Sequence, residues 1–408
     1  MKKEKPIILT LSNGLRIVIR QSDGNVSYIG VAVNAGSRDD PADREGLAHF
    51  LEHTIFKGTK HRKSWHISNR LESIGGELNA YTSKEETLIY TNSPAGNAER
   101  AIELLADIIA DSIFPEHELR KEQDVVIEEI KSYLDSPADA VFDIYEELIY
   151  AGSALAHNIL GTPESVRSLR GSDCRGFLDT RYTPDNMVIY AVDPGSPARI
   201  ERLMERYFGR LHFTSSGLNR VPPEVVKQFD RTIDENGHQA HTIMGTRLFG
   251  RQDPRRYALF LLNNHLGGPC MNSRLNQEIR ERRGLAYTVD SNVALLSDTG
   301  TFNIYIGSDR EMVQKCTGVV RRELDRLAQA PMSERLFNRI REQYRGQLLV
   351  STDHREAAAM SLGKSLLYYN EVYDAAYTAD RIMQVTREDL LEMARLIASH
   401  PLNRLTLQ

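Results

Sequence analysis

The sequence predicts an α+β protein built from two related halves of about 200 residues each. The chain has 408 residues, which exceeds the ~100–200 residues of a typical domain. Strand-like and helix-like patterns of apolar residues alternate along both halves. The sequence LNAYT at 78–82, followed by TLIY at 87–90, has a weak echo in LAYT at 285–288, followed by FNIY at 302–305. A linker rich in Ser, Gly and Pro at 213–230 is expected to separate an N-terminal domain, 1–212, from a C-terminal domain, 231–408.

The first half is predicted to begin with a hairpin. Asn13-Gly14 lies between two short apolar runs, which is typical of a tight turn between strands. Gly75-Gly76 follows an amphipathic stretch and predicts the end of a helix. The predicted strands span 7–11, 15–20, 28–34, 77–83, 87–92 and 186–192, and the predicted helices span 46–56, 64–74, 98–112, 117–134 and 138–150.

The second half is predicted to contain a similar mixture of helices and strands. A helix predicted at 256–266 ends at Gly267-Gly268. The other predicted helices span 272–282, 311–329 and 333–349, and the predicted strands span 285–293 and 300–307.

Composition argues against several classes of partner. The 51 basic and 56 acidic residues give a formal net charge of −5, which supplies no basic surface for nucleic acid or for a membrane. Cys174, Cys270 and Cys316 lie far apart, so they predict neither a disulfide framework nor a thiolate metal site and fit a reducing compartment. The sequence shows no signal peptide and no apolar run long enough to span a membrane. A cytoplasmic location is therefore expected.

The helix predicted at 46–56 carries two histidines and a glutamate on one face. His49 and His53 are one helical turn apart, so both imidazoles can reach a single ion. Glu52 falls on the same face, beside His53. This His-x-x-Glu-His order is the inverzincin pattern, the reverse of the His-Glu-x-x-His zinc helix. Neutral imidazoles suit zinc, and a catalytic zinc uses three protein ligands and a water molecule.

The helix predicted at 117–134 offers the third ligand. Glu122 and Glu129 lie along one edge of its apolar stripe, whereas Glu128 points toward solvent. A buried carboxylate is costly unless it is paired or bound to a metal ion. We therefore expect Glu129 to be the third ligand and Glu122 to be a neighbouring carboxylate. A plainer role for Glu122, as the buried partner of a lysine or arginine, stays open.

This set of side chains suits hydrolysis. A bound zinc ion lowers the pKa of its water to ~7 and polarises a carbonyl group. Glu52 is placed to take a proton from that water and to pass it to a leaving amine. The expected cofactor is one Zn²⁺ ion per chain.

The sequence resembles the pitrilysin/insulinase family of zinc peptidases, which includes the mitochondrial processing peptidase. The similar segments follow the family's order and cover most of the chain. They are LSNGL at 11–15, GLAHFLEHTIFKGT at 46–59, GGELNAYT at 75–82, EQDVVIEEI at 122–130, LGTPE at 160–164, YTPDN at 182–186 and RERRGLAY at 280–287.

The resemblance implies a fold and further site residues. Each half is expected to be a mostly antiparallel sheet packed by helices. The family's glutamate ligand falls on Glu129, 76 positions after His53, and its helper glutamate falls on Glu122. An arginine and a tyrosine that bind the substrate backbone fall on Arg280 and Tyr287, which are donors suited to a developing oxyanion.

The resemblance also implies how substrate binds and how chains assemble. In the family an extended peptide adds as a strand to a sheet edge, and Asn79, Ala80 and Tyr81 match that edge. Members form a chamber from four such domains, of which this chain supplies two. The expectation is an endopeptidase for peptides or unfolded segments. It would be a homodimer in which Arg280 and Tyr287 of one copy face the zinc of the other, with a heterodimer as the alternative.

Other interpretations stay open. A non-catalytic scaffold of the same family would lose the metal residues, which this chain keeps. A small metal-dependent lyase shares the His-x-x-Glu-His order but uses a cysteine as third ligand, and no cysteine here matches that position. Presequence processing and general peptide disposal are not distinguished by sequence. Tyr287 could simply pack in a strand, His157 has some prospect of lying near the site, and Trp65 is expected to pack.

Overall fold

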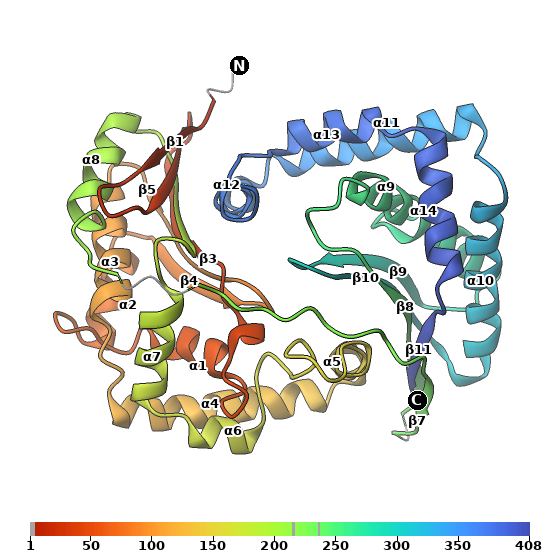
Figure 1. The fold of residues 1–408 in the computed structure, drawn as a ribbon, viewed down its shortest axis with the longest axis horizontal. Coiled ribbons are helices and arrows are strands. Elements are labelled where there is room, and N and C mark those ends of the chain that lie inside the picture. Colours follow the sequence, from red (N-terminus) through yellow and green to blue (C-terminus); the bar gives the residue numbers. More distant parts are fainter. Residues whose placement is uncertain (1–4, 214–216, 236) are drawn as a thin grey trace. The chain divides into compact units, whose positions relative to one another are not determined.

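The computed structural model describes residues 5–213, 217–235 and 237–408. These residues form two compact units, each with its own β-sheet (Figure 1). The first unit comprises the described parts of Met1–Ile130, His157–Arg220 and Thr352–Asp374. The second comprises the described parts of Lys131–Ala156, Val221–Ser351 and Ala375–Gln408.

The first unit is built on a six-stranded sheet in the order β1-β2-β6-β3-β5-β4, which leaves β4 at an edge. The pairing of β2 with β6 is parallel, and the other pairings are antiparallel. The strands are β1 (Ile7–Thr10), β2 (Arg16–Gln21), β3 (Val26–Val33), β4 (Glu77–Thr82), β5 (Thr87–Pro94) and β6 (Met187–Asp193).

Helices cover both faces of this sheet. Successive strand residues point to opposite faces, so Ile17 and Ile19 join the larger core while Val18 joins a smaller core under α12 (Arg355–Tyr369). The larger core is formed with α1 (Leu47–Thr54), α2 (Ser64–Glu72), α3 (Ala98–Asp111), α4 (Glu116–Leu134), α6 (Pro163–Ser168), α7 (Gly171–Arg181) and α8 (Pro197–Tyr207).

The packing of α12 depends on two glycines beside one large side chain. Tyr190 of β6 is fully buried between Gly30 of β3 and Gly363 of α12. A Cβ atom at either glycine would overlap the Tyr190 ring. The close approach of α12 to the sheet is therefore specified by residues that are more than 150 positions apart in the sequence.

The second unit has a five-stranded sheet in the order β7-β11-β8-β10-β9. Here β7 pairs in parallel with β11, and the other pairings are antiparallel. The strands are β7 (Asp230–Ile233), β8 (Gln239–Leu248), β9 (Thr288–Leu295), β10 (Gly300–Asp309) and β11 (Asn403–Leu407). The helices are α5 (Pro137–Ile149), α9 (Arg256–Gly267), α10 (Val313–Gln329), α11 (Glu334–Ser351), α13 (Ala375–Gln384) and α14 (Arg387–Ser399).

The predicted fold class is confirmed, since each unit is a mostly antiparallel sheet packed by helices. The units depart from the expected domains of 1–212 and 231–408, because α5 packs on β8 and β11 while α12 packs on β2, β3 and β6. Of the expected linker, residues 217–229 form neither helix nor strand, and 214–216 lie outside the described residues. The expectation that Trp65 packs is wrong, because this side chain on α2 is 67% exposed.

Candidate metal centre

Helix α1 brings His49, Glu52 and His53 to one side. The two histidine rings lie one turn apart in an edge-to-face arrangement, with their centroids 4.6 Å apart. His49 is buried and His53 is partly exposed. The opposite side of α1 buries Leu47, Phe50 and Leu51 in the larger core, and this burial fixes which way the histidines point.

Helix α4 supplies the two glutamates predicted from its apolar stripe. Glu129 Oε2 lies 3.8 Å from His49 Nε2 and 3.5 Å from His53 Nε2. One potential ligand atom from each of these three residues lies within 4.8 Å of the others. Glu128 is exposed, as its position on the helix predicted. The structure therefore brings together the three residues predicted as ligands.

Glu122 lies on the far side of the His53 ring from Glu129. Its Oε2 atom is 3.3 Å from His53 Nδ1, and its Oε1 atom is 2.7 Å from Lys57 Nζ. When His53 Nδ1 carries a proton, it donates to Glu122 and leaves Nε2 free to bind an ion. Glu122 therefore matches both expectations from the sequence. It is a carboxylate next to His53, and it is also the partner of a lysine. Lys57 was not singled out from the sequence, although it lies four residues after His53.

Charge is distributed unevenly over these groups. Burial, together with the neighbouring His53, lowers the pKa of His49 to about 4. Burial also opposes a charge on His53, but Glu122 and Glu129 more than offset this and raise its pKa to about 9. Hydrogen bonding from His53 holds the pKa of Glu129 below its usual value. The cluster therefore stabilises one positive charge between carboxylates, which a divalent cation can replace.

Glu52 is mostly buried beside Thr82, the last residue of β4. Burial raises the pKa of the Glu52 carboxyl, and the nearby Thr82 and His53 offset part of this rise. A carboxylate with a raised pKa accepts and returns a proton more readily near neutral pH. The position of Glu52 on the histidine side of α1 suits a proton carrier rather than a third ligand.

The donor set fits a zinc ion. Two imidazole nitrogens and one carboxylate oxygen are the ligands that a catalytic zinc site uses. Within the described part of the chain, Nδ1 of His49 is buried without a hydrogen-bond partner. Its Nε2 atom, at 3.8 Å from Glu129, is too far away for a hydrogen bond. An ion bound by Nε2 of His49 and by the Glu129 carboxylate would give both of these atoms a partner.

Arg280 and Tyr287 belong to the second unit. Arg280 lies in a π-helical turn, Asn276–Glu281, and its side chain is 46% exposed. Tyr287 precedes β9, is 56% exposed and donates a hydrogen bond to Asp309 at 2.9 Å. The alternative that Tyr287 simply packs in a strand does not hold, since an exposed ring buries little area. Both side chains are accessible, and the Tyr287 hydroxyl must leave Asp309 before it can donate to another group.

The strand that carries Asn79, Ala80 and Tyr81 is β4, at the edge of the first sheet. One side of β4 pairs with β5, so backbone groups on its other side have no strand partner within the described sheet. The Tyr81 hydroxyl donates to Glu86 at 3.1 Å and accepts from Lys364 at 3.2 Å. The side chain of Tyr81 is thus engaged with α12, while the backbone edge is available.

A second group with metal-ligand spacing comprises His61, Asp107 and Asp111. Its carboxylates are already paired with cations. Lys60 Nζ lies 2.7 Å from Asp111, and Arg62 lies 2.6 Å from Asp107. These cations oppose the entry of a metal ion, so this group is a weaker candidate.

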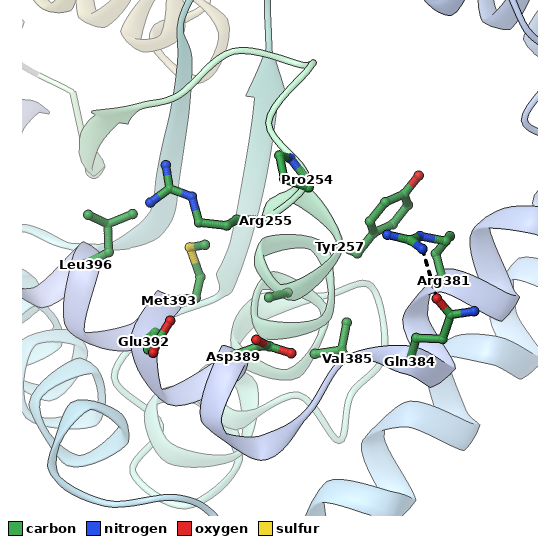
Figure 2. A pocket seen from close by; sticks show the side chains of 11 residues that line it. Pro254, Arg255, Tyr257, Arg381, Gln384, Val385, Asp389, Glu392, Met393 and Leu396 are labelled. Atoms are coloured by element: carbon green, nitrogen blue, oxygen red, sulfur yellow. Dashed lines mark hydrogen bonds between the residues drawn. The ribbon is translucent and has the colours of Figure 1, made fainter.

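A cavity of about 310 Å³ lies in the second unit between α9, α13 and α14 (Figure 2). Its two arginines already have partners, because Arg255 pairs with Asp253 at 2.6 Å and Arg381 donates to Gln384 at 2.9 Å. None of the residues predicted for the site lines this cavity.

Comparisons with known proteins show the family of this chain. A family model described as "Insulinase (Peptidase family M16)" matches residues 16–163, and one described as "Peptidase M16 inactive domain" matches 169–344. An uncharacterized zinc protease of Bacillus subtilis is 35% identical over 359 residues, which cover 88% of this chain and 87% of that protein. Another, from Streptomyces coelicolor, is 32% identical over 95% of this chain and 86% of its own length. The chain belongs to the pitrilysin/insulinase (M16) family of peptidases.

Solved structures show the same M16 fold. A protease from Helicobacter pylori has a TM-score of 0.87 at 20% identity and covers 100% of both chains. A peptidase M16 inactive domain from Pseudomonas fluorescens has a TM-score of 0.90 at 18% identity and covers 99% of this chain and 98% of that one. Among the described residues of this M16 chain, no helix is both long and apolar enough to cross a membrane.

Proposed function

We propose that this M16 chain is a zinc metalloendopeptidase that hydrolyses peptides and unfolded segments. The observation that carries the proposal is the convergence of His49, His53 and Glu129 within 4.8 Å, with Glu52 on the same side of α1. His49, His53 and Glu129 would hold one zinc ion per chain. Relatives named zinc proteases, aligned over most of their length, support this choice of metal.

Each residue then has a defined task. Bound zinc supplies a Lewis acid that activates water and polarises the scissile carbonyl. Glu52 takes a proton from the attacking water and delivers it to the leaving amine. Glu122 fixes the tautomer of His53 by accepting from Nδ1, and Lys57 balances the charge of Glu122.

Substrate binding is assigned to the edge of β4 and to the second unit. An extended peptide would pair with the backbone at Asn79, Ala80 and Tyr81, a mode that reads backbone more than side chains. Arg280 and Tyr287 would donate to the substrate backbone or to the developing oxyanion. This mode favours unfolded substrates, because a folded segment has no free strand edge to offer.

We propose a homodimer in which Arg280 and Tyr287 of one copy act on substrate at the zinc site of the other. The proposal follows from the family's four-domain chamber and from the two units of this chain. Dilution tests the homodimer, because activity per chain should fall when the protein concentration drops below the dimer dissociation constant. Full activity of a monomer at high dilution would exclude it.

We also propose a cytoplasmic location, as expected from the sequence.

The rival function is a non-catalytic subunit of the same family. A single comparison separates the two: zinc content and cleavage of a quenched peptide, measured on wild type and on Glu52→Gln. The peptidase predicts one zinc per chain in both proteins and cleavage by wild type alone. Equal cleavage by the two proteins would contradict the role of Glu52 as general base. No cleavage by a zinc-loaded wild type over a size-graded peptide panel would favour the rival.

A further inference from the structure

The helix that carries the metal residues has no side-chain cap of its own. Helix α1 is eight residues long, and isolated helices shorter than ~12 residues are marginal in water. Its N-cap is Gly46, held at φ 86°, which offers no side-chain acceptor. The first N–H groups of a helix need acceptors from outside it. His49 is the third residue of α1, so it lies in the turn that would fray first.

Asp40 supplies those acceptors from outside the helix. Its Oδ2 atom accepts from the Gly46 N–H and its Oδ1 atom from the Ala48 N–H, both at 2.8 Å. The Asp40 side chain is fully buried. Common caps accept from the second or third residue after them, whereas Asp40 reaches six and eight residues ahead. The negative charge at a helix N-terminus is also favourable.

Further contacts surround Asp40. His157 Nε2 lies 3.5 Å from Asp40 Oδ2, and the His157 carbonyl accepts from Lys84 Nζ at 2.6 Å. The adjacent Asp39 binds Arg220 at 2.7 Å. These contacts restrain the segment that carries Asp40 within the first unit.

The α1 N-terminus also fits tightly against the loop that follows His157. A Cβ atom at Gly46 would lie 2.6 Å from the Leu160 carbonyl oxygen, and one at Gly161 would lie 2.5 Å from the Glu45 carbonyl oxygen. This close backbone packing restrains the first turn of α1. The hydrogen bonds to Asp40 restrain the same turn through its N–H groups.

We infer that Asp40 is a positioning residue for the zinc site, acting through the backbone of Gly46 and Ala48 to fix His49. The inference rests on the proposed function, since it assigns a role toward the same ion. Asp40 contacts neither the ion nor substrate. Its removal should loosen the first turn of α1, raise the zinc dissociation constant and leave the second unit unchanged.

The test measures zinc affinity by competition with a chromophoric chelator, using full-length wild type, Asp40→Ala and Asp40→Asn. Loss of groups that orient metal ligands costs about 10- to 100-fold in affinity, and Asp40→Ala should fall in that range. Asp40→Asn keeps one oxygen acceptor and should show a smaller increase. The asparagine variant decides the question if the alanine variant does not fold. Visible spectra of the cobalt-substituted proteins should change in the same order.

A matched control separates positioning from general stability. Thr386 caps α14 in the second unit by accepting from Asp389 N–H at 3.1 Å, and Thr386→Ala should lower the melting temperature without changing zinc affinity. All measurements are made where melting curves show each protein fully folded, because lost stability alone then leaves the dissociation constant unchanged. Zinc binding by the soluble Asp40 variants within twofold of wild type would overturn the inference. A wild type that binds no zinc would instead overturn the proposed function.

Discussion

The imidazole of His53 lies with its Nδ1 atom 3.3 Å from Oε2 of Glu122. This contact orients the ring so that Nε2 faces Glu129, 3.5 Å away. One histidine is thus held between two carboxylates from a single helix, α4. The contact of Nδ1 with Glu122 therefore sets the tautomer of His53, and this tautomer leaves Nε2 free for the proposed ion.

Replacing Glu122 by Gln should weaken zinc binding by about 10- to 100-fold, because the amide can no longer fix the His53 tautomer through a charged acceptor. Chelator competition measures the effect. Lys57→Met is the control, since it removes the lysine and keeps the Glu122–His53 contact. Its zinc affinity should therefore fall less than that of Glu122→Gln. An affinity for Glu122→Gln equal to that of wild type would contradict the assigned role.

Tyr287→Phe should lower kcat by about 100-fold while zinc content stays the same, because loss of one oxyanion donor costs about 10²–10³. Steady-state kinetics on a quenched peptide measure it. Tyr133→Phe, a substitution of another partly exposed tyrosine, should leave kcat unchanged. If the two variants have the same kcat, Tyr287 does not act on the reaction.

Arg220→Ala should destabilise the first unit. The guanidinium is 8% exposed and binds Asp39 at 2.7 Å and Asn34 Oδ1 at 3.0 Å. Removing one partner of a buried ion pair costs about 3–5 kcal/mol, because the remaining charge stays buried. Urea unfolding measures the free energy. Arg231→Ala, at an exposed position of β7, is the control. Equal stability of the two variants would show that the Arg220–Asp39 ion pair does not stabilise the first unit.

His265 should make the stability of the second unit fall in mild acid. Burial, together with Arg274 and Arg339, lowers the pKa of His265 to about 4. An unfolded chain binds a proton at its ordinary pKa of about 6.5, so between these values the unfolded state holds more protons. The stabilisation is therefore complete above pH 6.5 and is lost as the pH falls toward 4.

The shift of His265 corresponds to about 3 kcal/mol. The free energy of unfolding of wild type minus that of His265→Gln should decrease by this amount between pH 7 and pH 4. Both proteins keep the same metal residues, so the pH dependence of the metal site cancels in this difference. A difference that does not change with pH would show that His265 titrates normally in the folded protein.

Much of the first unit and of the metal centre follows from local sequence patterns. The i, i+4 spacing of the histidines and the stripe of α4 placed Glu122 and Glu129 correctly, because helical geometry determines which residues share a face. Lys57 and Asp40 were missed, since their partners depend on how separate elements pack. The sequence also did not predict that α5 packs in the second unit and α12 in the first. For α12, the close packing against the sheet depends on Gly30 and Gly363 lying beside Tyr190, which only the folded structure shows.

The most direct measurement is the metal content of purified wild type, Glu129→Gln and Glu128→Gln after dialysis against dilute zinc. The two glutamates are neighbours on α4, but only Glu129 faces the histidines. We expect one zinc per chain in wild type and Glu128→Gln, and much less in Glu129→Gln. Full zinc occupancy in Glu129→Gln, or none in wild type, would contradict this expectation.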